Sequence, residues 1–183
     1  MATPITTSTD SAALSTADII IIFVPQVDAP ACSGAVKAVD EALAGAISDL
    51  AADGEINGKR GTVTVIHTLG KLPAKRVLIA GLGKPETLSL DTLRDAAAGA
   101  ARRSRGVGGG DLAIAIDGDP LGTSESAQAV VEGLRLGLYR FDRHLSPSDD
   151  RKEIGSVTLH GPDSTALKYG AEMGEILADA TNF

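Results

Sequence analysis

Three histidines are the first residues to test for metal binding, because imidazole is a common metal ligand. They are His67, His144 and His160, and none has a Cys, Asp or Glu at the close spacing typical of metal ligands on one element. His67 and His160 each end a predicted strand, where we expect a hydrogen-bonded structural role. The histidines therefore predict no metal site in this chain.

Two acidic residues and one thiol are the next candidates. Asp117 and Asp119, in the sequence IDGDP, could bind a cation, but a solvated loop leading into a helix explains them equally well. Cys32 lies just before a predicted helix opening at Ser33, a position that can lower the pKa of a thiol. It has no basic partner in the sequence, and a single cysteine forms no internal disulfide, which fits a reducing compartment.

The sequence GLGKPE at residues 81–86 follows a predicted buried strand and invites a nucleotide-binding interpretation, because glycines there let a backbone approach a pyrophosphate. The match to known motifs is poor. There is no third glycine for a dinucleotide fingerprint and no Lys-Ser or Lys-Thr for a P-loop, and Pro85 lacks an amide hydrogen. We interpret Gly81 and Gly83 as a structural turn, with a phosphate site as the alternative.

Composition and charge narrow the classes of function. The chain has 183 residues, 43% hydrophobic and 22% charged, which is typical of one soluble globular domain. Its net charge of -7 argues against a polyanionic partner, because Lys and Arg supply most non-specific affinity for nucleic acid. The first apolar run, Ile19 to Val24, is too short for a signal or membrane segment, so we expect a cytoplasmic protein with no membrane contact.

The best-marked unit is a strand, a turn and a helix between Lys75 and Gly106. An apolar run at residues 76–80 predicts a strand buried on both faces, and the glycine turn ends it. We expect Ser89 to cap the helix that follows and Gly106 to stop it in the left-handed conformation. Three arginines near the end of this helix, Arg102, Arg103 and Arg105, match the helix dipole; a nucleic-acid contact is the weaker interpretation of this cluster.

The remaining pattern predicts an α/β fold, with a mixed, mostly parallel sheet and helices on both faces. Residues 18–24 form a strand, followed by one helix from Ser33 to Asp53. The connection between the strands at residues 62–68 and 76–80 is too short for a helical crossover, so we expect antiparallel neighbours. Residues 1–17 are either a tail or an edge strand.

The second half repeats the strand and helix alternation. After a strand at residues 111–117, Thr123 or Ser124 is expected to cap a helix. Gly133 and Gly137 lie four apart on one face of this helix and predict a close backbone approach to the sheet. A last strand at 154–161 precedes a helix capped by Asp163 or Ser164.

The apolar spacing of the last helix continues to Phe183 without a stop signal, so we expect the chain to be part of a longer polypeptide. We divide the chain into a tail or edge strand at residues 1–17, a domain at residues 18–163, and the start of a connector helix at residues 164–183.

The run AVVEGLRLGLYRFDRH carries the most specific signal. It resembles the EG...G.YRFD segment in the N-terminal domain of leucyl (cytosol) aminopeptidases, and so do LPAKRVLIAGLGKPE and the closing GEILADATNF. The resemblance covers nearly the whole chain from Asp18. The residues that match this family signature, for which we expect structural roles, are Gly81, Gly83, Glu132, Gly133, Gly137, Tyr139, Phe141 and Asp142.

This resemblance implies a macro-like fold and a non-catalytic role in assembly and access to the active sites. Members of the family are homohexameric exopeptidases in which two divalent metal ions, zinc or manganese, activate a water molecule. Their metal ligands and their catalytic Lys and Arg belong to the C-terminal domain, which also binds the peptide substrate. Those motifs are absent here, so the resemblance assigns no catalytic, cofactor-binding or metal-binding residue to this chain.

Two other hypotheses remain open at this point. A macro-like fold could be a stand-alone module that binds ADP-ribose or a related nucleotide. The sequence FVPQVDAP after the first predicted strand, where ligand-binding macro domains usually have an Asn-rich turn, counts against it. A DNA contact, as in some bacterial aminopeptidases, has only the arginine cluster in its favour.

Overall fold

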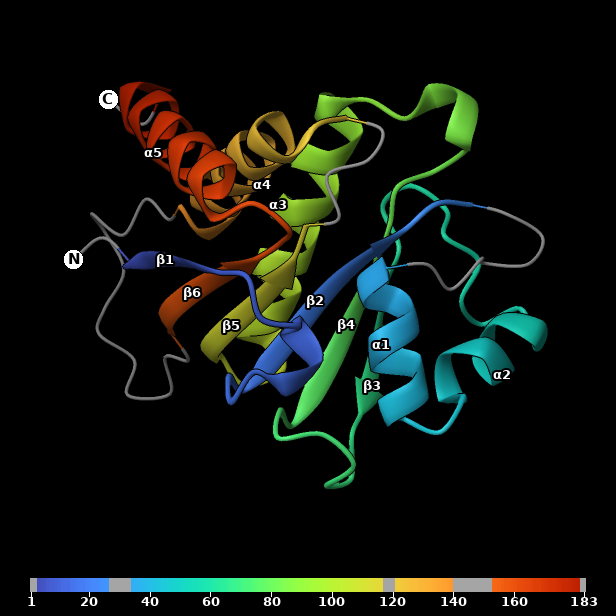
Figure 1. The fold of residues 1–183 in the computed structure, drawn as a ribbon. Helices are drawn as coiled ribbons and strands as arrows, with labels where there is room; N and C mark the ends of the chain where they lie inside the picture. The colour runs from blue at the N-terminus through green and yellow to red at the C-terminus, as the bar shows by residue number, and fades with distance from the viewer. Residues whose placement is uncertain (1–2, 27–33, 117–120, 140–152, 182–183) are drawn as a thin grey trace, which may run out of the picture.

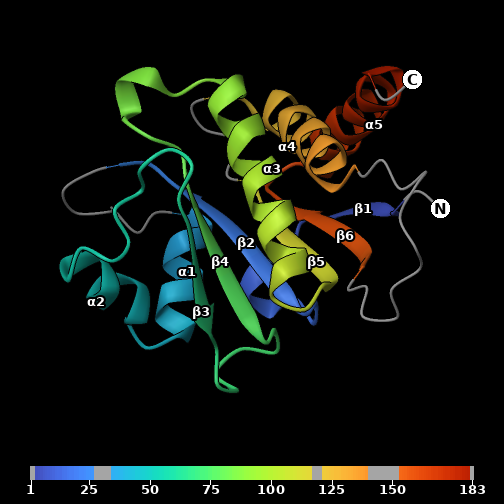
Figure 2. The same ribbon diagram turned by 180° about the vertical axis from the view of Figure 1, so that it is seen from behind.

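The computed structural model describes residues 3–26, 34–116, 121–139 and 153–181. One sheet lies between two layers of helices (Figures 1 and 2). The strands are β1 (Ile5–Ser8), β2 (Ile19–Val24), β3 (Val63–His67), β4 (Arg76–Gly81), β5 (Gly110–Ala115) and β6 (Ile154–His160). The helices are η1 (Ala12–Leu14), α1 (Gly34–Ala42), α2 (Ala46–Ala52), η2 (Pro85–Thr87), α3 (Leu90–Gly106), α4 (Thr123–Leu138) and α5 (Ser164–Thr181).

The sheet has six strands in the order β1-β6-β5-β2-β4-β3. All neighbours are parallel except β3 and β4, which pair antiparallel. This confirms the mixed sheet and the antiparallel pair that the short connection predicted. At the opposite edge, β1 pairs with β6, so the residues around Ile5 form an edge strand.

Both faces of the sheet are covered by apolar residues. Ile19 and Ile21 of β2 belong to the core cluster under α3, α4 and α5, which lie side by side on one face (Figures 1 and 2). Ile20 and Ile22 belong to the cluster on the other face, where η1 and α1 pack. A strand buried on both faces needs a continuous apolar run, which explains the sequence IIII. Within the described ranges, no helix is long and apolar enough to cross a membrane.

Asp18, just before β2, ties together the amino ends of three strands. Its carboxylate accepts hydrogen bonds from Lys75 Nζ at 2.6 Å and from the Asp111 amide at 3.1 Å. These bonds, the Lys75 bond first, lower the pKa of Asp18 below its ordinary value of 3.8. Because the pKa is lower in the folded state, the ionised carboxylate stabilises the fold fully at pH values above the unfolded pKa. This contribution is lost as the pH falls through the folded pKa.

Two predicted helix starts are confirmed and one is wrong. Ser89 caps α3 in a capping box with Thr92, and the carboxylate of Asp163 accepts hydrogen bonds from the first amides of α5. Neither Thr123 nor Ser124 caps α4, which begins at Thr123 after Gly122, a residue without a side chain to cap it. The end of α3 also differs from the prediction, because Gly106 is still helical and Val107 is the C-cap.

The single helix predicted from Ser33 to Asp53 is wrong, because the chain breaks into α1 and α2. Ala44 and Gly45 at the break have positive φ angles of 60° and 85°. The buried carboxylate of Asp40 accepts hydrogen bonds from the amide of Ile47 at 2.7 Å and from the hydroxyl of Ser48 at 2.5 Å. A side chain of α1 thus satisfies amides at the start of α2, which a reading of apolar spacing alone does not detect.

Glycines set the distance between the three helices of one layer. The close approach predicted for Gly133 and Gly137 exists, but the partner is α3 and not the sheet. A Cβ atom on Gly133 would lie 2.2 Å from the carbonyl oxygen of Arg94, and one on Gly137 would lie 2.6 Å from that of Ala98. Gly170 and Gly174 of α5 meet the backbone of α4 in the same way. Each helix therefore packs against its neighbour by backbone contact.

We predict that Gly133→Ala destabilises the domain by about 1–3 kcal/mol, the usual cost of overpacking a close contact. Gly99→Ala is the matched control, since Gly99 lies inside α3 and its added Cβ would meet only Val63, at 3.7 Å. That control should stabilise the domain by about 0.5–1 kcal/mol through helix propensity. Urea denaturation of both variants measures the difference, and equal effects of the same sign would contradict the contact.

Candidate functional site

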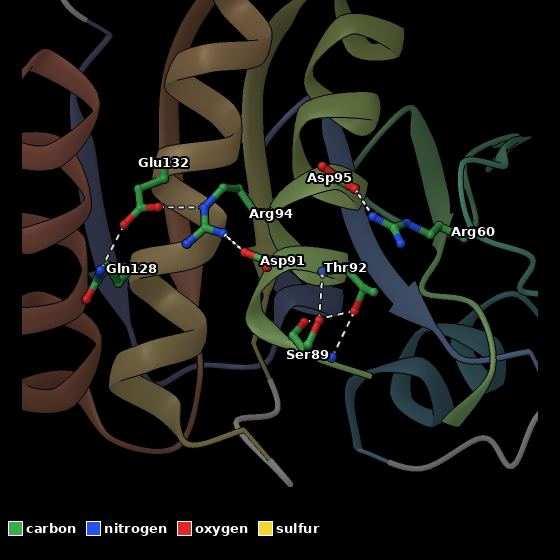
Figure 3. A network of polar contacts seen from close by, with 8 residues as sticks. All are labelled: Arg60, Ser89, Asp91, Thr92, Arg94, Asp95, Gln128 and Glu132. Carbon is green, nitrogen blue, oxygen red and sulfur yellow. Dashed lines mark hydrogen bonds and ion pairs between the residues drawn. The ribbon is translucent and has the colours of Figure 1, made fainter. Parts of the chain in front are cut away.

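The signature residue Glu132 lies at the centre of a polar network between α3 and α4 (Figure 3). Its carboxylate accepts hydrogen bonds from Arg94 Nε at 2.5 Å and from Gln128 Nε2 at 2.8 Å. Arg94 also pairs with Asp91, one helical turn earlier on α3. The Glu132 side chain is only 10% exposed and that of Arg94 28%, so this ion pair is largely screened from water.

The electrostatics of this network favour a fixed ion pair over acid–base chemistry. Burial by itself would lower the pKa of the Arg94 guanidinium, but the bonds to Glu132 and then Asp91 outweigh it and raise the pKa above its ordinary value. A guanidinium held so firmly in its charged form exchanges no proton near neutral pH. The network therefore orients α3 against α4 beside the glycine contacts.

The signature residues that follow Glu132 fall into three places. Gly133 and Gly137 face α3, as described above. Tyr139 follows α4 with its side chain half exposed. Phe141 and Asp142 lie outside the described residues, so their expected roles stay predictions.

The amides of the glycine turn after β4 are hydrogen-bonded within the chain. The amides of Gly81, Leu82 and Gly83 donate to the carbonyl oxygens of Thr62, Val24 and Gly58, at 2.9 to 3.0 Å. The carboxyl ends of parallel strands are where open α/β sheets usually bind ligands. Since all three amides already have backbone partners, this turn offers none of them to a phosphate.

Backbone also fills the space beside this turn. A Cβ atom on Gly81 would lie 2.1 Å from the carbonyl oxygen of Lys59, and one on Gly58 would lie 2.2 Å from that of Pro25. The segment around Gly58 thus packs directly over the ends of β2 and β4. The arrangement closes this part of the carboxyl edge with the chain's own backbone.

The two histidines that the structure describes differ in their surroundings. His160, at the carboxyl end of β6, is buried, and its Nδ1 lies 2.9 Å from the carbonyl oxygen of Asp10. A carbonyl oxygen only accepts, so Nδ1 carries the proton, and the buried Nε2 has no partner within the described part of the chain. His67 ends β3 and is exposed.

No group of three or more His, Cys, Asp or Glu that could hold a metal ion occurs among the residues the structure describes. His144, Cys32, Asp117 and Asp119 fall outside the described ranges. The roles considered for these four residues therefore stay predictions.

Sequence reasoning missed the partners of the signature. Arg94 received no role, although Asp91 three residues earlier on the same helix was a visible signal for a helical ion pair. The pair of Arg60 with Asp95 and that of Arg135 with Glu175 join residues 35 and 40 positions apart. No local pattern predicts partners at such separations.

The sequence from residue 20 to 148 matches the family described as "Cytosol aminopeptidase family, N-terminal domain". A protein named "Probable cytosol aminopeptidase" from Geotalea uraniireducens (strain Rf4) is 35% identical over 141 residues. The alignment covers 77% of this chain but only 28% of that relative. The chain thus spans less than a third of the length of this relative.

Solved structures show the same fold. A mutant of tomato leucine aminopeptidase superposes with a TM-score of 0.71 over 92% of this chain and 35% of its own, at 18% identity. A Trypanosoma brucei macrodomain crystallised with ADP-ribose gives a TM-score of 0.67 over 92% of this chain and 68% of its own, at 14% identity. At these identities the likeness establishes a macro-like α/β sandwich and no shared activity.

We predict that Arg94→Ala destabilises the domain by about 2 kcal/mol, because the buried Glu132 carboxylate would lose its charged donor. Arg60→Ala is the matched control, since Arg60 pairs with Asp95 of α3 and both of those side chains are more than half exposed. Its cost should stay within about 0.5 kcal/mol. Thermal unfolding measures the stability of the two variants. Equal losses of stability would contradict a larger contribution from the Glu132 network than from an exposed ion pair.

Proposed function

Since the chain belongs to the cytosol aminopeptidase family, whose N-terminal domain it contains, we propose that it works as the non-catalytic N-terminal part of a metal-dependent aminopeptidase. The single observation that carries this proposal is the polar and glycine contact between α3 and α4. There the signature residues Glu132, Gly133 and Gly137 all serve packing. All three are buried residues of α4, which supports a structural role.

The finer parts of the proposal follow from the family. We propose that the full-length protein removes N-terminal amino acids from peptides with two divalent metal ions, zinc or manganese, bound outside this domain. The relatives' name supports a cytoplasmic location. We further propose that the domain contributes to a homohexamer and shapes access to the active sites. The match covers 28% of the Geotalea relative, and the remaining 72% of its length is large enough for a catalytic domain.

The alternative is a stand-alone module that binds ADP-ribose or a related nucleotide. Its support is likeness of fold to macrodomains at low identity. Against it stands the turn at Gly81 to Gly83, whose three amides already donate to backbone carbonyls. A ligand phosphate at this turn would have to displace the chain's own hydrogen bonds, at a cost of about 1–3 kcal/mol for each group left unsatisfied.

A domain exchange tests the proposal. The matched stretch of the Geotalea uraniireducens relative is deleted, or replaced by residues 1–183 of this chain, and each product is assayed with leucine p-nitroanilide and by sedimentation. We expect deletion to abolish assembly and lower hydrolysis, and replacement to restore both. Because we propose that the restored activity depends on the metal, chelation should abolish hydrolysis. Adding zinc or manganese afterwards should restore it. Replacement that behaves like deletion would contradict the proposed role.

A further inference from the structure

Exposed apolar side chains gather on the last two helices. Seven large hydrophobic side chains are exposed in the described part of the chain, and five of them lie on α5 or at the end of α4. Those five are Leu136, Tyr139, Tyr169, Ile176 and Leu177. Exposed apolar residues that are scattered singly need no explanation, but a cluster on one part of the surface indicates an interaction site.

The α5 residues of this cluster follow the spacing of a helix–helix seam. Tyr169, Met173, Ile176 and Ala180 are separated by four, three and four residues, which places them on one stripe of the helix. Tyr169 is 61% and Ile176 60% exposed. We name this stripe, with Leu177 beside it, the outer seam of α5.

The opposite face of α5 already has its partners. Leu167, Gly170, Ala171, Gly174 and Ala178 are buried. The two glycines meet the backbone of α4, and Figures 1 and 2 show α5 as the last helix of its layer. The sequence pattern that ran through the whole helix therefore divides into an inner face that packs within this domain and the outer seam.

Charge at the edge of the seam indicates what kind of partner fits. Glu172 and Asp179 lie seven residues apart along one side of the seam, and both are exposed. Neither forms an ion pair with another described residue. At such flanking positions, opposite charges on two helices select the partner. A helix with Lys or Arg along the facing edge complements this acidic side.

The same charges disfavour a second copy of the chain. Two α5 helices packed antiparallel through their outer seams would place Glu172 of one beside Asp179 of the other. Parallel packing would place Glu172 beside Leu177. Like charges directly opposed cost affinity, as does a carboxylate buried against an apolar side chain. An acidic flank also repels the anionic surface of a membrane.

We propose that the outer seam of α5 docks an amphipathic helix with a basic flank, supplied by the polypeptide that follows this domain in cytosol aminopeptidases. This rests on the proposed function, because the occupant comes from the part of the protein outside the matched stretch. A helix attached to the same polypeptide gains a high effective concentration, so a seam of four residues suffices. The docking fixes the following domain against α5 and hence against the glycine-packed layer.

Fluorescence tests the seam directly, because the chain contains no tryptophan. Tyr169→Trp places a single tryptophan on the seam of the otherwise complete chain. The probes are two designed helical peptides with identical Leu at the seam positions and either Lys or Glu along one flank. We expect water-like emission from the chain alone, and a saturable shift to shorter wavelength, at one-to-one stoichiometry, with the Lys-flanked peptide only.

Variants separate the apolar and the charged contributions. Adding Ile176→Glu should weaken the Lys-flanked peptide about tenfold or more, as expected for a lost central anchor. The control is Leu69→Glu, which alters an exposed apolar residue away from the seam and should change nothing. Replacing Glu172 and Asp179 together by Lys should reverse the preference to the Glu-flanked peptide. Circular dichroism confirms that each variant is folded.

Several results would overturn the proposal. They are short-wavelength emission from the dilute chain alone, a shift that appears with rising protein concentration and no peptide, equal binding of both peptides, or no binding.

A second arm tests the source of the helix. Overlapping peptides from the part of the Geotalea relative outside the match should include one that displaces the Lys-flanked probe. If none does while the domain exchange restores activity, the docking surface is wrong and the proposed function stands.

Discussion

Backbone contact between parallel helices is the constraint on which this structure depends. Gly133 and Gly137 bring α4 onto α3, and Gly170 and Gly174 bring α5 onto α4, at distances that exclude any Cβ atom. Polar side chains also bridge each pair of helices. The bonds from Arg94 to Glu132 and from Arg135 to Glu175 do this across the two contacts. The position of α5, and with it the outer seam, follows from that layer.

The chain's own backbone occupies one part of the carboxyl edge of the sheet. Parallel strands that end at one edge ordinarily leave amides free for a ligand. Here the segment around Gly58 lies over the ends of β2 and β4, and the amides of Gly81 to Gly83 donate to backbone carbonyls. This turn therefore offers none of its three amides to a ligand.

The sequence predicted what depends on local pattern. The buried strands, the antiparallel pair at Val63–His67 and Arg76–Gly81, and the Ser89 cap all come from apolar runs, connection length and capping chemistry within a few residues. The break between α1 and α2 was not predictable in this way, because Asp40 caps a helix that begins six residues later. The partner of Gly133 was assigned to the sheet because spacing shows that a face is small but not what packs against it. Arg94 was missed because its bond to Glu132 crosses 38 residues.

A structural role for the turn at Gly81 to Gly83 and nucleotide binding there lead to opposite expectations, and one titration distinguishes them. Amide NMR signals of Gly81, Leu82 and Gly83 are followed while ADP-ribose is added to the complete chain, with calorimetry on the same sample. We expect no saturable change below millimolar concentration, because all three amides are already hydrogen-bonded within the chain. Saturable shifts of these amides at micromolar ADP-ribose, with one-to-one heat, would contradict it and establish a binding module.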